Sequence, residues 1–419
     1  MRHRIKIELP EDVGCIIRKL EEAGFEGYAV GGCIRDSILG KAPEDWDIAT
    51  NAKPPDIKRC FARTVDTGIA HGTVTVLLKK KSYEVTTYRV DGVYSDGRHP
   101  DRVEFSSLLE EDLRRRDFTI NAMAYSGKEG LIDLFGGMED LERKLIRCVG
   151  SAEERFGEDA LRMLRAARFC AQLDFRIEED TYSSMKQLAE GLLKVSKERV
   201  LVEMNKALLS KQPQRLKILE ESGLARFISS SFSLLGEEDY LNLEGIAKLP
   251  PHKGLRWAAL LCKREGGFAG VLLKELKADN ETTQKVSLLI KEGKESLPQS
   301  REGIKTLLRK IGAENLRDLL LLKENAYCRG GESGEDLERI RLLTEEIIEK
   351  KEAYQVRMLS IGGEELKSLG LRQGPLLGKI LEEILKEVII HPEYNQRDVL
   401  MELAKKYIHR EKEQNNERL

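Results

Sequence analysis

The clearest candidates for chemistry in this 419-residue chain are two aspartates separated by one residue, Asp45 and Asp47. In a β-strand, successive side chains alternate between faces, so both carboxylates would share one face while Trp46 and Ile48 point into the core. Carboxylates placed in this way can hold two Mg²⁺ ions, which activate an attacking hydroxyl and neutralise a triphosphate in phosphoryl transfer. Taken alone, the pair is also compatible with a solvated loop.

A glycine turn precedes this pair by about a dozen residues. Gly31 and Gly32 follow a short apolar run at 28–30 and open a segment that continues through Arg35. Glycines at a strand-to-helix turn let backbone N–H groups approach a phosphate, and Arg35 would lie one turn into the helix. A plain tight turn is the alternative.

Glu84 lies in an alternating, β-branched run at 82–89, which a Lys-rich turn separates from a similar run at 72–78. The two runs predict a β-hairpin. Glu84 could face the same cleft as Asp45 and Asp47 and supply a third catalytic carboxylate. An ordinary exposed strand glutamate explains the same pattern equally well.

Arginine, aspartate and asparagine recur in the string Arg115–Ala122. The guanidinium of Arg116 suits triphosphate oxygens bidentately, and Asp117 could accept from a ribose hydroxyl. Without further support, the start of a surface helix with a salt bridge would be the preferred interpretation.

A second such string, Glu158–Arg165, has helical character and predicts that Asp159 and Arg162 share one helix face. An aspartate accepts from an exocyclic amine and an arginine donates to ring nitrogen and carbonyl acceptors, so the pair could imitate a complementary base for C or A. G and U present the opposite order of donors and acceptors. A surface ion pair is the alternative.

The elements that must position these residues divide the chain into an α+β N-terminal head and an all-α C-terminal half. β-type patterns fade after about residue 140, and Leu, Ala, Glu, Lys and Arg then recur at helical intervals. Breaks that contain proline suggest further boundaries. The predicted domains are a catalytic head at 1–140, a helical neck with base recognition at 141–215, a helical body at 216–300 and a helical tail at 301–419.

Composition narrows the class of protein. The opening residues carry no apolar stretch that would indicate a signal or an anchor, and no membrane segment is present. Seven scattered cysteines with no C-x-x-C pair predict free thiols in a reducing compartment, the cytoplasm, and the dispersed histidines predict that any metal is held by carboxylates. The net charge of −2 places phosphate recognition in local basic clusters.

Four strings in order, Gly31–Asp36, Asp45–Thr50, Arg115–Ala122 and Glu158–Arg165, resemble the class II tRNA nucleotidyltransferase and bacterial poly(A) polymerase family. The resemblance implies a polymerase β-like head, catalysis dependent on two Mg²⁺ ions, and CTP and ATP as substrates. It assigns catalysis to the carboxylates Asp45, Asp47 and Glu84, and metal binding to the first two. It assigns nucleotide binding to Gly31, Gly32, Arg35, Arg116, Asp117, Asn121, Asp159, Arg162, Arg165 and Arg168.

Two features favour tRNA maturation within that family. Gly68–Val74 is similar to the G-x-x-H-G-T-V string of tRNA enzymes, and Val90–Pro100 resembles the flexible loop of enzymes able to add A. We therefore expect C, C and A to be added to the tRNA 3′ end, with contacts to the acceptor arm and no obligatory protein partner. CC-only, A-only and poly(A) addition, a catalytically idle RNA-binding scaffold and a small-molecule nucleotidyltransferase are the alternatives.

Overall fold

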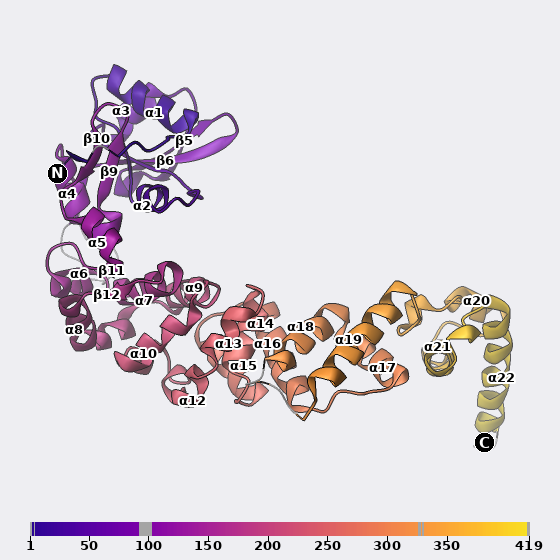
Figure 1. The fold of residues 1–419 in the computed structure, drawn as a ribbon. Helices are drawn as coiled ribbons and strands as arrows, with labels where there is room; N and C mark the ends of the chain where they lie inside the picture. The colour runs from indigo at the N-terminus through magenta and orange to yellow at the C-terminus, as the bar shows by residue number, and fades with distance from the viewer. Residues whose placement is uncertain (1, 4, 92–102, 326–327, 329–330, 417–419) are drawn as a thin grey trace. The chain divides into compact units, whose positions relative to one another are not determined.

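The computed structural model describes residues 2–3, 5–91, 103–325, 328 and 331–416 (Figure 1). The chain forms two compact units, one of Met1–Lys253 with Val271–Asp279 and one of Gly254–Gly270 with Asn280–Leu419. The domain boundaries near residues 140, 215 and 300 remain predictions. Residues 92–100 of the expected flexible loop, Val90–Pro100, lie outside the described residues.

A mixed sheet of eight strands forms the first part of the first unit, in the order β1-β10-β9-β2-β3-β6-β5-β4 within the described residues. β3 and β6 run parallel, whereas β2 with β3 and β5 with β6 are antiparallel. The strands are β1 (Arg2–His3), β2 (Tyr28–Val30), β3 (Asp47–Thr50), β4 (Thr64–Gly68), β5 (Thr73–Leu78), β6 (Lys81–Thr87), β9 (Met123–Ser126) and β10 (Gly130–Asp133). β7 (Arg89–Asp91) pairs separately with β8 (Val103–Phe105).

The predicted hairpin is confirmed as β5 and β6, but the strand expected at 45–47 begins only at Asp47. β3 pairs with β2, and this ladder ends where Val30 meets Asp47. Gly31 then turns the chain away with φ 84°, so β2 offers no backbone partner to the residues before Asp47. Ile48 is buried as expected, whereas Trp46 is only half-buried and Asp45 precedes the strand.

Helices cover this sheet because their apolar residues recur at helical spacing. α1 (Glu11–Glu22) buries Val13, Ile16, Ile17 and Leu20, and it lies beside α3 (Pro54–Cys60) against the sheet (Figure 1). α2 (Gly32–Ile38) packs on β2 and β9. Two further helices of this part are α4 (Leu109–Arg114) and α5 (Gly137–Arg143).

The described remainder of the first unit is helical, as predicted, except for two short strands. β12 (Arg176–Ile177) runs parallel to β11 (Leu145–Ile146), because the N–H groups of Arg176 and Glu178 donate to the carbonyls of Lys144 and Ile146. α7 packs along α9. The helices are α6 (Ala152–Glu158), α7 (Leu161–Leu173), α8 (Glu179–Gln187), α9 (Lys197–Leu208), α10 (Ile218–Glu221), α11 (Ala225–Ile228), α12 (Glu237–Tyr240) and α13 (Leu243–Lys248).

Helices alone build the described part of the second unit, with α14 and α15 crossing its boundaries along the chain. A core of leucine, isoleucine, valine and alanine side chains joins α20, α21 and α22. The helices are α14 (Lys253–Leu260), α15 (Gly266–Glu275), α16 (Asn280–Lys294), α17 (Arg301–Ile311), α18 (Ala313–Glu324), α19 (Gly334–Glu349), α20 (Gly363–Ser368), α21 (Pro375–Ile390) and α22 (Arg397–Asn416).

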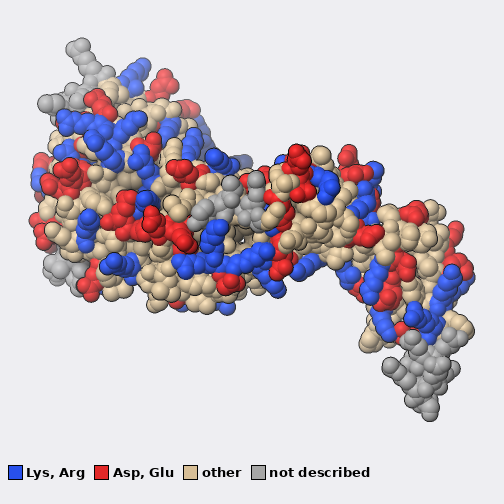
Figure 2. Space-filling model, turned by 60° about the horizontal axis from the view of Figure 1, so that its bottom comes forward, with Lys and Arg blue, Asp and Glu red and all other residues tan. Residues whose placement is uncertain are grey.

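Charges of both signs are interspersed on the face of the molecule in Figure 2, in keeping with the net charge of −2. None of the described helices combines the length and the apolar character that crossing a bilayer requires. A negatively charged substrate must therefore be recognised at a local concentration of basic side chains rather than by the overall charge.

A buried ion pair stabilises the second unit. Lys305 on α17 is fully buried, and its ammonium donates to Glu352 at 2.8 Å and to the carbonyl of Ile389 at 3.1 Å. Hydrogen bonds from Arg301 lower the pKa of Glu352 to about 2; burial opposes this shift and the bond from Lys305 assists it. Removal of this carboxylate would leave a buried ammonium without its counter-charge.

Glu352→Gln is expected to lower the free energy of unfolding by about 3 kcal/mol at pH 7. The folded pKa of Glu352 lies below its unfolded value near 4.5, so its contribution is complete above pH 4.5 and is lost as pH falls towards 2. Denaturation followed by circular dichroism should therefore show that the difference in the free energy of unfolding between wild type and variant becomes smaller below pH 4.5. The control Glu364→Gln, at an exposed pair with Lys367, should leave unfolding nearly unchanged. A difference in the free energy of unfolding that does not depend on pH would contradict the stabilising role of the Glu352 charge.

Candidate active site

The sequence-predicted residues meet around a cavity of about 490 Å³ in the first unit. The described residues that line it include seven arginines and three aspartates, so the cavity favours an anionic ligand. The predicted residues brought together here are Gly31, Gly32, Arg35, Asp47, Arg116, Asp117, Asn121, Asp159, Arg162, Arg165 and Arg168. Asp45 and Glu84 are not part of the lining.

Gly31 lets an arginine approach the turn after β2. Its φ of 84° lies in the left-handed region that favours glycine. A Cβ at this position would also lie 2.9 Å from Nη1 of Arg116. The glycine therefore makes room for a guanidinium beside the start of α2.

The three predicted carboxylates interact electrostatically through the sheet. Ile48 on β3 is in register with Val85 on β6, which places Asp47 and Glu84, one residue earlier on each strand, side by side. Asp47 is exposed at the start of β3, but partial desolvation by the surrounding protein raises its pKa; Arg116 opposes the shift and Asp45 adds to it. Burial and the charges of Asp47 and Asp45 raise the pKa of Glu84. Close carboxylates that repel one another fit a divalent cation, which would relieve that repulsion.

Within the described residues, no three such side chains form a ready-made metal cluster. Mg²⁺ is usually bound by one or two carboxylates together with substrate phosphates rather than by a complete protein cage. Asp45 and Asp47 are therefore a suitable donor set for a Mg²⁺ ion that arrives with a nucleotide.

Asp112 holds the two arginines of the Arg115–Ala122 string, a function that the sequence did not predict. It is fully buried and accepts hydrogen bonds from Arg115 at 2.6 Å and from Arg116 at 3.1 Å. Burial acts to raise the pKa of Asp112, but Arg116 and Arg115 outweigh it and hold that pKa below its usual range. The buried Nε of Arg116 has no hydrogen-bond partner among the described residues, and it is available to a ligand only through a local movement.

Asp117 links the head to α7. One of its oxygens accepts from Asn121 at 3.0 Å, and the other accepts from Nε of Arg165 at 2.7 Å. Burial would raise the pKa of Asp117, but Arg165 and the bond from Asn121 reverse that effect and lower it. The carbonyl oxygen of the Asn121 side chain in turn accepts from Arg35. Contact between Asp117 and a ribose hydroxyl remains a prediction.

The helix expected at 158–165 is interrupted, which corrects the predicted placement of Asp159. α6 ends at Glu158, and Asp159 has extended backbone angles (φ −144°, ψ 101°) before α7 begins at Leu161. The side chain of Asp159 accepts from the Leu161 N–H at 3.1 Å and so satisfies a free donor of the α7 start. Asp159 and Arg162 therefore converge on the cavity from a helix break rather than from one helix face.

Other side chains hold both members of this pair. Arg199 on α9 donates to the two oxygens of Asp159 at 2.7 and 3.3 Å. Arg162 donates to Glu158 at 2.5 Å and to the carbonyls of Arg155 and Arg115 at 3.0 and 3.1 Å. Each side chain is thus fixed in orientation before any ligand binds.

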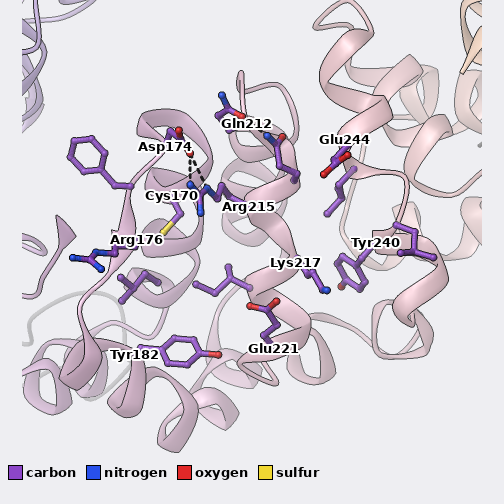
Figure 3. A pocket seen from close by; sticks show the side chains of 16 residues that line it. Cys170, Asp174, Arg176, Tyr182, Gln212, Arg215, Lys217, Glu221, Tyr240 and Glu244 are labelled. Carbon is purple, nitrogen blue, oxygen red and sulfur yellow. Dashed lines mark hydrogen bonds and ion pairs between the residues drawn. The ribbon is translucent and has the colours of Figure 1, made fainter. Parts of the chain in front are cut away.

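A second cavity, of about 840 Å³, lies among α7, α8, α10 and α13 (Figure 3). Asp174 and Arg215 form an ion pair at its side, and Glu221, Glu244 and Lys217 mix further charges into its lining. Although this cavity is larger, it contains none of the predicted site residues. The chemistry of the four strings therefore assigns the active site to the smaller cavity.

Comparison with known proteins matches three parts of the chain to family models. Residues 27–147 match the poly A polymerase head domain, 174–233 a probable RNA and SrmB-binding site of polymerase A, and 251–404 a putative tRNA nucleotidyltransferase domain 2. The chain is 37% identical to a CCA-adding enzyme of Ligilactobacillus salivarius over 407 residues, which cover 94% of this chain and 95% of the relative. The chain belongs to the CCA-adding enzyme family.

Other members of the CCA-adding enzyme family support the same grouping. A CCA-adding enzyme of Leuconostoc mesenteroides is 38% identical over 416 residues, 96% of this chain and 98% of the relative. The crystal structure of a Bacillus stearothermophilus CCA-adding enzyme in complex with CTP is 31% identical, with a TM-score of 0.78 over 96% of this chain and 98% of the other. The resemblance in the four strings is therefore confirmed at the level of the family and the fold.

One aromatic side chain that sequence reasoning missed is central to the arginine cluster of this CCA-adding enzyme family member. Phe169 on α7 is buried, and its ring centroid lies 4.2, 5.0 and 5.6 Å from the guanidinium carbons of Arg168, Arg35 and Arg165. The rings of Phe169 and Phe118 are nearly perpendicular, with their centroids 5.8 Å apart. An aromatic face attracts cations, so Phe169 holds three like charges close together. The feature of the sequence that could have indicated Phe169 is its position directly after Arg168, which was itself a predicted site residue.

Phe169→Leu is expected to raise the KM for nucleotide roughly tenfold with a smaller change in kcat, because each lost cation–π contact contributes about 0.5–2 kcal/mol. Phe169→Trp retains an aromatic face and should recover most of the affinity. Steady-state kinetics with CTP measure both quantities. Equal KM values for the leucine and tryptophan variants would mean that Phe169 acts only by packing in the core and not through its aromatic face.

Proposed function

We propose that this protein adds C, C and A in turn to the 3′ end of tRNA from CTP and ATP, releases pyrophosphate and uses no nucleic-acid template. One observation supports the selection of C and A over U and G. Asp159 and Arg162 converge on the nucleotide cavity with some of their hydrogen-bonding capacity used and some free. What remains free defines the base that they can bind.

The remaining capacity matches a cytosine edge. A carboxylate offers about four acceptor positions, and bonds from Leu161 and Arg199 occupy three of those on Asp159. A guanidinium has five N–H donors, and within the described residues three of those on Arg162 are bonded. One acceptor of Asp159 and two donors of Arg162 therefore remain for a ligand, and both residues line the cavity.

Cytosine presents an amine donor, a ring-nitrogen acceptor and a carbonyl acceptor, which complement this set. Adenine presents the amine and one ring-nitrogen acceptor, so it satisfies the acceptor of Asp159 and one donor of Arg162. Uracil and guanine place a carbonyl where Asp159 needs a donor and an N–H where Arg162 needs an acceptor. Each would bury unpaired polar groups, which disfavours its binding.

The arginine cluster suits the other end of the nucleotide. Arg35, Arg165 and Arg168 lie around Phe169, and Arg116 lies beside the turn at Gly31, so triphosphate oxygens would meet several fork-shaped donors. Asp45 and Asp47 would hold Mg²⁺, which when bound activates the attacking hydroxyl and neutralises the leaving group. Glu84 contributes negative charge beside them.

The reaction we infer is attack of the tRNA 3′ hydroxyl on the α-phosphate. A new O3′–Pα bond forms, the bond between the α- and β-phosphates breaks, and the hydroxyl proton is lost. Recognition of tRNA would rest on the shape and phosphates of the acceptor arm, contacted by the helical part of the chain. The cytoplasm, as the compartment of tRNA maturation, is part of the same proposal.

The test is a panel of RNA acceptors. Purified protein with CTP, ATP and Mg²⁺ should extend both tRNA that lacks CCA and tRNA that ends in CC, and it should leave oligo(A) unextended. Extension of oligo(A) alone would indicate a poly(A) polymerase. RNA binding without pyrophosphate release would indicate an idle scaffold, and nucleotide transfer unaffected by tRNA would indicate a small-molecule substrate.

A further inference from the structure

Two cysteines that are distant in sequence meet inside the second unit. Cys262 follows α14, and Cys328 lies in the turn after α18, 66 residues later. Their sulfur atoms are 2.6 Å apart, and Cys328 Sγ also lies 3.7 Å from the carbonyl oxygen of Ala259. Unbonded sulfur atoms normally remain farther apart than this, whereas a disulfide bond is about 2.05 Å long.

The surroundings of the two sulfurs allow reaction with a small oxidant. Cys262 and Cys328 are half-buried, whereas Cys33, Cys148 and Cys170 are buried. Cys15 and Cys60 are also half-buried, but they lie on α1 and α3 of the first unit. A half-buried thiol with a second thiol in contact differs from an isolated one, because its oxidised form has a partner with which to react.

We propose that Cys262 and Cys328 form a reversible thiol pair that a peroxide converts to a disulfide within the second unit. One cysteine thiol loses its proton, and the thiolate attacks hydrogen peroxide and breaks the O–O bond. The hydroxide that leaves takes up this proton, so the products are a sulfenic acid and one water. The thiol of the other attacks that sulfur, the S–S bond forms and a second water leaves. Two thiols and one peroxide thus yield one disulfide and two waters. A dithiol reductant restores the pair.

This bond would restrain the unit that contains it. It would close a loop that contains α15, α16, α17 and α18, and it would tie the turn after α18 to the end of α14. Cross-linking two distant positions reduces the conformational freedom of the unfolded chain. Neither cysteine lines the nucleotide cavity, so the pair is independent of the proposed chemistry there.

The experiment treats the full-length protein with a small molar excess of hydrogen peroxide and then counts thiols in denaturant. The count should fall from seven to five, since two thiols are consumed, and dithiothreitol should restore seven. Trypsin digestion without reduction should give the peptides Trp257–Lys263 and Glu324–Arg329 joined and lighter by two hydrogen atoms. Thermal unfolding of the oxidised protein should shift upwards by several degrees.

Cys262→Ser removes one partner, so the joined peptides should disappear and the unfolding temperature should no longer depend on peroxide. Cys15→Ser is the matched control, and its thiol count should fall from six to four with the same joined peptides. Oxygen addition to Cys328 in the wild type without joined peptides would overturn the proposal. Joined peptides that contain any other cysteine would overturn it as well.

Discussion

Asp47→Asn is expected to lower the rate of nucleotide addition by roughly 10³-fold or more, because a metal ion bound at a reacting phosphate contributes several kcal/mol to the transition state. Asparagine keeps the size of the side chain at the start of β3 and removes the negative charge. The pKa of Asp47 is raised by partial desolvation and by the charge of Asp45, which indicates a carboxylate that gains from a nearby cation. Single-turnover kinetics with saturating CTP and tRNA lacking CCA measure the chemical step.

Asp66→Asn is the matched control for this loss. Asp66 lies on β4 of the same sheet, half-exposed, and pairs with Lys58. Its substitution should leave the rate within about twofold of wild type, since an exposed pair contributes little. CTP binding by Asp47→Asn, measured without metal, should persist because the arginine cluster is intact. A variant that keeps more than a tenth of the wild-type rate would place the metal elsewhere.

Asp159→Ala is expected to relax the choice of base by on the order of 100-fold, which corresponds to the 1–3 kcal/mol cost of a buried polar group left unpaired. The variant loses the acceptor for the amine of C and A, so the rate with CTP should fall while the rate with UTP changes little. The substitution also releases Arg199 from its ion pair with Asp159. Competition between CTP and UTP for one tRNA measures the ratio directly.

Glu153→Ala is the control for this variant. Glu153 is exposed in the first turn of α6, and its removal should leave the CTP-to-UTP preference unchanged. Arg162→Lys should reduce addition of C more than addition of A, because lysine cannot offer the same fork and C uses both free donors. If Asp159→Ala retained full discrimination, base choice would have to reside in other residues of the cavity.

Local patterns in the sequence predicted the β5–β6 hairpin, the glycine turn after β2 and the helical character of the later chain. The four strings also located the cavity. What they missed depends on pairing between distant segments. Asp45 lies outside a strand because the pairing of β3 with β2 ends at Val30, before the turn at Gly31. The residues near Asp45 contain no pattern that predicts where this pairing ends.

Long-range contacts likewise escaped prediction at the site. Arg199 lies 40 residues after Asp159, and their ion pair exists only because α9 packs along α7. Glu203, one turn further along α9, pairs with Arg168 at 3.0 Å for the same reason. The break between α6 and α7 had only a weak local signal, namely Gly157 and Asp159, which are among the residues that least favour a helix interior.

The most direct test of the proposed function is extension of a tRNA transcript that ends at the base before CCA, with CTP, ATP and Mg²⁺ present and the product sequenced at its 3′ end. We expect three added nucleotides in the order C, C, A and then arrest, from one cavity and without a template. Arrest after two cytidines would identify a CC-adding enzyme. Addition of a single A only when CC is already present would identify an A-adding enzyme, and either result would contradict the proposed addition of C, C and A.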